Sequence, residues 1–207
     1  MIAIADVCSG NLRSVERALT KVGAEVVVTR DADVVRRADK VIVPGQGAFG
    51  VFMQALSDAR GMGDALREVI ARGTPYLGIC LGMQVLFESS EESLVPGTTT
   101  EGLGLLRGRV VRLAPTERTL KVPHIGWNRV AQRQRDPLLA DAEDGAYFYF
   151  VHSFHALPSD ESVLAATTDH GGRVTAAVRK DNVFACQFHP EKSQAVGLSL
   201  LSAFVRA

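Results

Sequence analysis

Short apolar segments alternate with helix-like segments through the first half of the chain. Residues 2–5, 25–29, 40–43 and 76–79 have the apolar character of buried strands, whereas 12–22 and 62–72 carry apolar side chains at helical spacing. Strands that alternate with helices form βαβ units, which place parallel strands in one sheet and helices on its faces. We therefore expect an α/β fold with an open, mixed, mostly parallel central sheet and flanking helices.

The second half has a different pattern, in which strand-like segments are joined by turns. The predicted strands are 109–113, 146–151, 163–168, 173–179 and 183–188, and His170-Gly171-Gly172 is one of the turns. We predict that they are antiparallel additions to the same sheet, followed by a final helix from about 193 to 205. No repeat or linker divides the 207 residues, so we expect one domain, residues 1–207.

The charge balance argues against two classes of partner. Lysine plus arginine and aspartate plus glutamate both number 23, so no net positive field attracts nucleic acid or an anionic membrane. No segment approaches the roughly 20 apolar residues of a membrane-spanning helix, and the N-terminus lacks the features of a signal peptide. Three cysteines are an odd and sparse set, typical of a reducing compartment. We expect a cytoplasmic protein that binds neither nucleic acid nor membrane.

A glycine-flanked cysteine lies where the fourth predicted strand meets a predicted helix, residues 81–89. Gly78-Ile79-Cys80-Leu81-Gly82 has the G-x-C-x-G pattern of a nucleophile elbow, a sharp turn that raises one side chain above the sheet. The helix N-terminus favours the thiolate of Cys80, and the Leu81 N–H can stabilise an oxyanion. The alternative interpretation is that Cys80 is a small buried core residue, as most free cysteines are.

A histidine and a glutamate two positions apart follow the last predicted strand. In extended chain, His189 and Glu191 project to the same side, so the carboxylate can accept a hydrogen bond from one ring nitrogen and orient the imidazole. A nucleophile, a base and an orienting acid make up a catalytic triad. Together with the elbow, this segment predicts that Cys80, His189 and Glu191 form such a triad.

A glycine-rich segment after the third predicted strand has two interpretations. Residues 45–50 match the G-x-G-x-x-G of dinucleotide-binding proteins. That pattern normally follows the first strand and requires an acidic residue about 20 positions later at a strand end, whereas Glu68 falls within a predicted helix. We favour a turn in which Gln46 or Gly47 supplies a second N–H to the oxyanion.

Two pairs of residues have the chemical types of zinc ligands. Cys186 and His189, like His152 and His155, are three positions apart in predicted strands, where such residues point to opposite faces. We therefore expect no metal and no cofactor, and interpret Cys186 as a buried apolar residue. His170, in its glycine-rich turn, is expected at the solvated surface.

The elbow and the histidine segment together resemble the class I, triad-type glutamine amidotransferases, which implies a flavodoxin-like fold. The matching residues are Gly78-Ile79-Cys80-Leu81-Gly82-Met83-Gln84 and Gln187-Phe188-His189-Pro190-Glu191. The resemblance covers nearly the whole chain and narrows to the glutaminase subunits of imidazole glycerol phosphate synthase. The segments that narrow it are Gly10-Asn11-Leu12, residues 44–50, Pro123-His124-Ile125-Gly126-Trp127-Asn128, residues 149–154 and residues 189–193.

This resemblance implies a reaction and a partner. Cys80 would attack the amide of L-glutamine to form a thioester, His189 would protonate the departing ammonia, and water would release glutamate. The ammonia would pass to a (β/α)8-barrel cyclase subunit in a heterodimer, which makes imidazole glycerol phosphate and aminoimidazole carboxamide ribotide in histidine biosynthesis. Two alternatives remain open: the glutaminase subunit of another synthase, such as anthranilate synthase, and a non-catalytic dinucleotide-binding module.

The same resemblance implies roles for residues outside the triad. Substrate binding is implied for Gly45, Gln84, His152, Ser153 and Phe154. Contact with the cyclase is implied for Asn11, Trp127, Tyr149 and Lys192, although the two aromatic residues also suit a protein core. Gln46 departs from the small apolar residue of many relatives, and Cys8 receives no role. We expect the isolated chain to hydrolyse glutamine poorly, because coupling avoids waste and because we expect the Gln46 loop to be oriented only when a partner signals.

Overall fold

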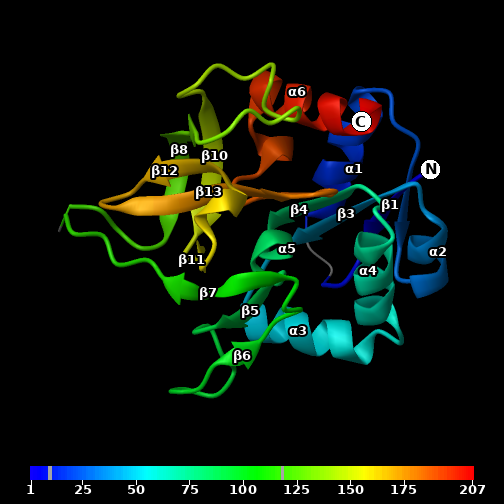
Figure 1. Ribbon diagram of the computed structural model, residues 1–207, viewed down its shortest axis with the longest axis horizontal. Helices are drawn as coiled ribbons and strands as arrows, with labels where there is room; N and C mark the ends of the chain where they lie inside the picture. The colour runs from blue at the N-terminus through cyan, green and yellow to red at the C-terminus, as the bar shows by residue number, and fades with distance from the viewer. Residues whose placement is uncertain (9–10, 118) are drawn as a thin grey trace.

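The parallel strands of the central sheet are β1 (Ile2–Ala5), β2 (Val26–Thr29), β3 (Lys40–Gly45), β4 (Tyr76–Cys80) and β14 (Val183–Cys186). Antiparallel strands extend this sheet: β13 (Arg173–Lys180), β12 (Leu164–Asp169) and β9 (Ala131–Gln132). The computed structural model, which describes residues 1–8, 11–117 and 119–207, places them in the order β2-β1-β3-β4-β14-β13-β12-β9 (Figure 1). Because the parallel strands follow the flavodoxin-like order, the predicted fold class is confirmed.

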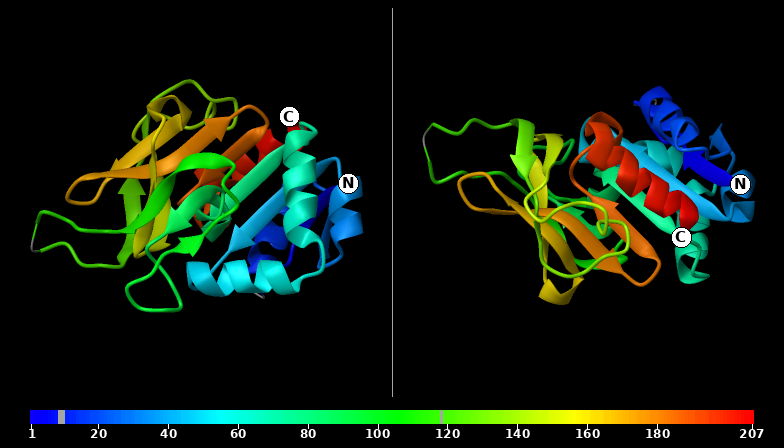
Figure 2. Two further views of the ribbon diagram at one scale, coloured as in Figure 1. Left: turned by 60° about the horizontal axis from the view of Figure 1, so that its bottom comes forward. Right: turned by 90° about the horizontal axis from the view of Figure 1, so that it is seen from above.

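Helices cover both faces of the parallel part of the sheet. α1 (Leu12–Lys21) and α6 (Gln194–Arg206) lie on one face, and α2 (Ala32–Arg37), α3 (Phe49–Asp58) and α4 (Met62–Ala71) on the other (Figures 1 and 2). Alternate residues of a strand point to opposite faces, so the isoleucines of β1 pack with α1 and α6 and its alanines with the other helices. Burial on both faces explains the uninterrupted apolar sequence of β1, β3, β4 and β14, whereas the edge strand β2, also expected to be buried, is only partly so.

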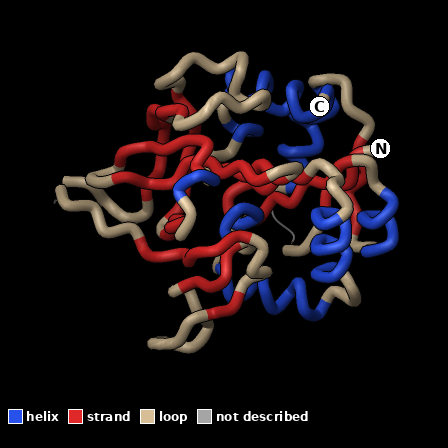
Figure 3. The backbone as a smooth tube through the Cα atoms, viewed as in Figure 1, coloured by secondary structure: helices blue, strands red, loops and turns tan. Residues whose placement is uncertain are grey.

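The strands of the second half extend the central sheet only in part. β12 and β13 join it as predicted, but β8 (His124–Arg129) and β10 (Tyr147–His152) form a separate two-stranded sheet. A four-stranded sheet contains β5 (Phe87–Ser90), β6 (Thr100–Glu101), β7 (Leu106–Arg112) and β11 (Phe154–Pro158). The helices therefore gather in the half of the molecule that holds both termini, and strands and loops form the other half (Figure 3).

The helix predicted over residues 81–89 is wrong beyond its first turn. α5 (Leu81–Gln84) ends after four residues, and the chain continues as β5, whose Phe87 pairs with Leu106 of β7. Phe87 is fully buried in this position. The pairing with a distant strand therefore overrides the local helical pattern. Among the described residues, the structure contains no helix with the length and apolar character that crossing a membrane requires.

Candidate active site

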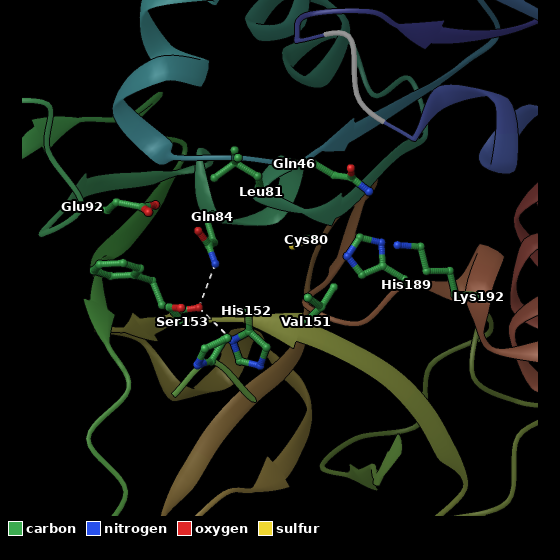
Figure 4. Close-up of a pocket in the computed structure, with 13 residues that line it drawn as sticks. Gln46, Cys80, Leu81, Gln84, Glu92, Val151, His152, Ser153, His189 and Lys192 are labelled. Carbon is green, nitrogen blue, oxygen red and sulfur yellow. Dashed lines mark hydrogen bonds between the residues drawn. The ribbon is translucent and has the colours of Figure 1, made fainter. Parts of the chain in front are cut away.

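The carboxyl end of β4 and the loop after β3 border a pocket of about 380 Å³ (Figure 4). Ligands of open α/β sheets bind at this end of the strands, and the volume suits a small metabolite. The lining residues are Gln46, Gly47, Cys80, Leu81, Gln84, Glu92, Pro123, Val151, His152, Ser153, Phe154, His189 and Lys192.

Cys80 occupies the sharp turn that the glycine pattern predicts. It ends β4 with φ 56° and ψ −108°, in the positive-φ region that non-glycine residues seldom adopt, and Leu81 begins α5 directly after it. A Cβ on Gly82 would lie 1.8 Å from the Val43 carbonyl oxygen, and one on Gly78 would lie 2.5 Å from the Gly82 carbonyl oxygen. Only glycine permits these approaches, so the flanking residues hold the elbow against β3.

His189 and Glu191 make the predicted contact, but not through an extended chain. His189 Nδ1 lies 2.8 Å from Glu191 Oε1, and both side chains are almost fully buried. Pro190 begins the 3-10 turn η2 (Pro190–Lys192) between them, so the turn and not strand alternation brings the two side chains together. Asn11 Nδ2 donates to the same carboxylate oxygen over 3.1 Å. Hydrogen bonds from His189 and Asn11 therefore fix the Glu191 carboxylate from two sides.

The electrostatics favour a charged imidazole beside the Cys80 sulfur. Burial, the largest single effect, lowers the pKa of His189, but Cys80 and Glu191 together outweigh it and raise this pKa to about 10. A protonated ring next to a thiol favours the thiolate. The other ring nitrogen, Nε2, has no nitrogen or oxygen partner among the described residues, which leaves it free to interact with Cys80 and with a ligand in the pocket.

Ser193 ties the histidine segment to β10. Its buried hydroxyl accepts a hydrogen bond from the Tyr149 N–H at 3.0 Å and donates to the His189 carbonyl at 2.7 Å. The His189 N–H in turn donates to the Tyr149 carbonyl at 2.9 Å. Three hydrogen bonds thus fix the main chain that carries the imidazole.

A buried amide to which the sequence assigns no role contacts the candidate nucleophile. Gln187 Nε2 lies 3.4 Å from Cys80 Sγ, and Gln187 is fully buried. Gln84 Nε2 donates to Gln187 Oε1 and to the Phe154 carbonyl, each over 2.9 Å. The parallel register of β14 and β4 could have revealed this contact. Cys186 pairs with Ile79 in that register, so the residues that follow them, Gln187 and Cys80, are also neighbours.

A row of histidines extends this network away from the pocket. His152 Nδ1 contacts the Phe154 carbonyl at 2.9 Å, its Nε2 lies 3.0 Å from His124 Nδ1, and His124 Nε2 lies 3.1 Å from Asn128 Nδ2. Burial lowers the pKa of His152 to about 3 and that of His124 to about 4, so both rings are neutral at neutral pH. His170, predicted at the solvated surface, is partly exposed, and its ring also stacks on His124 at 4.1 Å.

Comparison with known proteins assigns this architecture to a family. Residues 3–206 match the family model described as "Glutamine amidotransferase class-I". The chain belongs to the class I glutamine amidotransferase family. Two proteins with the name "Imidazole glycerol phosphate synthase subunit HisH" are each 48% identical to it: one from Geobacter sulfurreducens, with 98% of this chain and 97% of the relative covered, and one from Methanothermobacter thermautotrophicus, with 99% and 98% covered.

Solved structures of amidotransferases share the fold at low sequence identity. "Crystal structure of glutamine amidotransferase" aligns with a TM-score of 0.72 and 19% identity, covering 98% of both chains. "Trypanosoma brucei CTPS - glutaminase domain with bound acivicin" aligns with a TM-score of 0.66 and 16% identity, covering 99% of this chain and 93% of that one. At these identities the likeness concerns the fold alone.

The glycine-rich loop of this amidotransferase lies beside the elbow. Gly45 pairs with Cys80 across the sheet, and a Cβ on Gly45 would lie 2.7 Å from Leu81 Cβ, so this glycine permits close packing of the two segments. Gly47 has φ 95°, and both Gln46 and Gly47 line the pocket. Their N–H groups stay predicted oxyanion donors, together with that of Leu81.

The residues expected to bind substrate lie in the pocket, with one exception. Gln84, His152, Ser153 and Phe154 line it, whereas Gly45 does not. Glu92 is not predicted from the sequence, yet its side chain also lines the pocket (Figure 4) and accepts a hydrogen bond from the Phe49 N–H at 2.8 Å. Burial raises the pKa of Glu92. In the sequence Glu92 resembles an ordinary solvated residue of a polar loop.

Three of the four expected partner-binding residues form one cluster. Trp127 contacts Tyr149 edge-on, with 6.0 Å between ring centroids, and Lys192 Nζ lies 5.9 Å from the Tyr149 ring centroid. Trp127 is 45% exposed. Asn11 differs, because its amide donates to Glu191. Its contact with a partner stays a prediction, as do those of the cluster.

The residues considered as zinc ligands have other contacts. Cys186 Sγ is fully buried and lies 3.4 Å from the Phe188 carbonyl and 3.7 Å from the Gly78 carbonyl. His155 is buried in β11, and burial lowers its pKa to about 4. Within the described ranges, no three histidine, cysteine or acidic residues are grouped as a metal site would require.

Proposed function

We propose that this chain is the glutaminase subunit of an imidazole glycerol phosphate synthase. It hydrolyses L-glutamine and delivers ammonia to a cyclase subunit. The observation that carries the proposal is the meeting of Cys80 and His189 in one pocket of a class I amidotransferase, with Glu191 hydrogen-bonded behind the imidazole. The name shared by relatives that are 48% identical over nearly their whole length supports the choice of pathway.

The reaction proceeds through a covalent intermediate. The Cys80 thiolate attacks the side-chain amide carbon of glutamine, and the Leu81 N–H and an N–H of Gln46 or Gly47 stabilise the resulting oxyanion. The His189 imidazolium gives its Nε2 proton to the departing nitrogen, so ammonia leaves and a thioester remains. The neutral ring then takes a proton from water, which attacks the thioester. Collapse releases the product as a carboxylic acid, which loses its proton to solvent as glutamate, and restores the thiolate and the imidazolium.

The glutamine head group is held by amide and carboxylate oxygens. Both Nε2 hydrogens of Gln84 already have acceptors, so its Oε1 is the atom that can accept from the substrate's ammonium group. Glu92 supplies the negative charge that this ammonium requires, from the same pocket. The main chain around Ser153 and Phe154 completes the site.

Replacing Glu92 with glutamine should raise KM more than it lowers kcat. A charge-assisted hydrogen bond contributes roughly 1.5 to 3 kcal/mol, which corresponds to a KM about 10- to 100-fold higher. Steady-state glutamate release over a range of glutamine concentrations measures both constants. Glu91→Gln is the matched control, since Glu91 is exposed and accepts instead from the Arg112 N–H. Equal KM values for the two variants would show that Glu92 does not bind the substrate.

An exposed apolar face lies next to the pocket and is the surface to which the cyclase would bind. Ile125 and Trp127 of β8 and Tyr147 of β10 are 61%, 45% and 49% exposed. Val151 pairs with Ile125 across this small sheet and also lines the pocket. Large exposed aromatic and aliphatic side chains are typical of protein interfaces. A (β/α)8-barrel cyclase bound at this face would receive ammonia without its passage through bulk solvent.

Glutamate release with and without the cyclase and its nucleotide ligand tests the proposal. We expect low turnover of the isolated chain, a large increase on adding both, and a smaller increase in a Trp127→Ala variant. Val27→Ala is the control, since Val27 is 38% exposed on β2, an edge strand of the central sheet, to which β8 and β10 do not belong. Full turnover by the isolated chain, or activation by the subunit of another synthase such as anthranilate synthase, would contradict the proposal.

A further inference from the structure

The amide of Gln187 is placed where it acts directly on the candidate nucleophile. Its Nε2 lies 3.4 Å from Cys80 Sγ, and its side chain, on the residue that directly follows β14, is fully buried. A buried amide keeps its hydrogen-bond partners, because losing one costs the full desolvation of the unpaired group. The contact with sulfur is therefore a fixed part of the site.

The orientation of this amide follows from its neighbours. The Phe154 carbonyl can only accept a hydrogen bond, so Gln84 must turn its NH2 group toward that oxygen. The same NH2 group faces Gln187, which must therefore present its oxygen to Gln84. The NH2 group of Gln187 is then left to face Cys80. Reversing either amide would set two donors or two acceptors against each other.

We propose that Gln187 is a catalytic hydrogen-bond donor to the Cys80 sulfur and that Gln84 holds it in this orientation. The inference rests on the proposed role of Cys80 as nucleophile. A donor that points at sulfur stabilises the thiolate over the thiol, because a hydrogen bond to a charged acceptor is stronger than one to a neutral acceptor. It acts beside the His189 imidazolium and fixes the direction of the sulfur within the pocket.

Gln84 thereby serves two functions through different atoms. Its NH2 group orients Gln187, and its Oε1 faces the substrate in the proposed site. A substitution of Gln84 should therefore alter the chemistry of Cys80 even when no glutamine is present. This consequence separates an orienting residue from one that only binds substrate.

The rate of Cys80 alkylation by iodoacetamide, measured against pH without glutamine, tests the proposal. Mass spectrometry of the Cys80 peptide separates its reaction from those of the other two cysteines, Cys8 and Cys186. Gln187→Met keeps the length of the side chain and removes its donor. We expect the pH midpoint of alkylation to rise by roughly one to two pH units, so that the rate below that midpoint falls while the rate at high pH is retained.

Two further variants make the result specific. Gln84→Met should shift the midpoint in the same direction by a smaller amount, and it provides the test if Gln187→Met does not fold by circular dichroism. Gln132→Met is the control, because it removes a partly buried amide that donates to the Leu139 and Ala142 carbonyls. Its midpoint should equal that of the unchanged protein.

The outcomes distinguish this inference from the proposed function. If Cys80 of the unchanged protein reacts no faster than Cys8, Cys80 is not an activated nucleophile, and both proposals are overturned. If Cys80 is reactive but its midpoint is unchanged in Gln187→Met, or in Gln84→Met where the first variant does not fold, only the role of Gln187 is overturned. An upward shift in these variants, absent from Gln132→Met, supports it.

Discussion

A Cys80→Ala variant is expected to lower kcat for glutamine hydrolysis by at least about 10⁴-fold, because removal of the nucleophile of a triad leaves only substrate binding and oxyanion stabilisation. The sulfur has no substitute nearby: among the lining residues of the pocket, Cys80 is the single cysteine. Glutamate release should be measured with the cyclase and its ligand present, so that the unchanged protein is fully active.

Two measurements separate a loss of catalysis in Cys80→Ala from a loss of folding. Alanine keeps a Cβ at φ 56°, so the backbone conformation of the elbow is preserved and the unfolding temperature should change little. Cys8→Ala is the control, because Cys8 is half-buried and absent from the pocket lining. It should retain full turnover. Residual activity of Cys80→Ala within tenfold of the unchanged protein would remove the thioester mechanism.

Local sequence patterns predicted the parts of the fold that depend on local structure. The apolar strands and the glycine-flanked elbow follow from near neighbours along the chain, and both are present. The pairing of β8 with β10 joins Trp127 to Tyr149 and depends on contacts between distant segments. Alternation indicates which side chains are buried but not which strand a segment pairs with. The separate small sheets therefore escaped prediction, as did β5.

The residues of the site form two groups in the same way: some stand out in a short motif, and others gain a role only through contacts between distant segments. Cys80, His189 and Glu191 each carry a chemical type that stands out in a short motif. Gln187 and Glu92 carry common polar side chains, and their positions depend on neighbours far along the chain: Cys80 is 107 positions from Gln187, and Phe49 is 43 positions from Glu92. Gln187 lies within the matched motif, but its contact with Cys80, like the place of Glu92 in the pocket, depends on three-dimensional neighbours that the motif does not reveal.

The acid of the triad should control both catalysis and its pH dependence. Glu191→Gln keeps the shape of the side chain and removes its charge, and the equivalent change in a serine protease triad lowers kcat by about 10⁴-fold. We expect a loss of about 10²- to 10⁴-fold here, since the amide oxygen of the variant can still accept from His189 Nδ1 but cannot stabilise the imidazolium by charge. Exposed Glu143→Gln is the matched control.

The sign of the pH effect follows from the direction of the shift. The pKa of His189 is raised from its ordinary value of 6.5 to about 10, so the charged ring stabilises the fold fully below pH 6.5, and this contribution is lost as pH rises through about 10. Removing the Glu191 charge lowers the pKa of His189, so the charged ring contributes less stability and less stability is lost as pH rises. Unfolding temperatures measured from pH 6 to 10 should therefore fall less steeply in Glu191→Gln than in the Glu143→Gln control. Parallel curves would show that the carboxylate does not hold the imidazolium, and the loss of turnover would then need another cause.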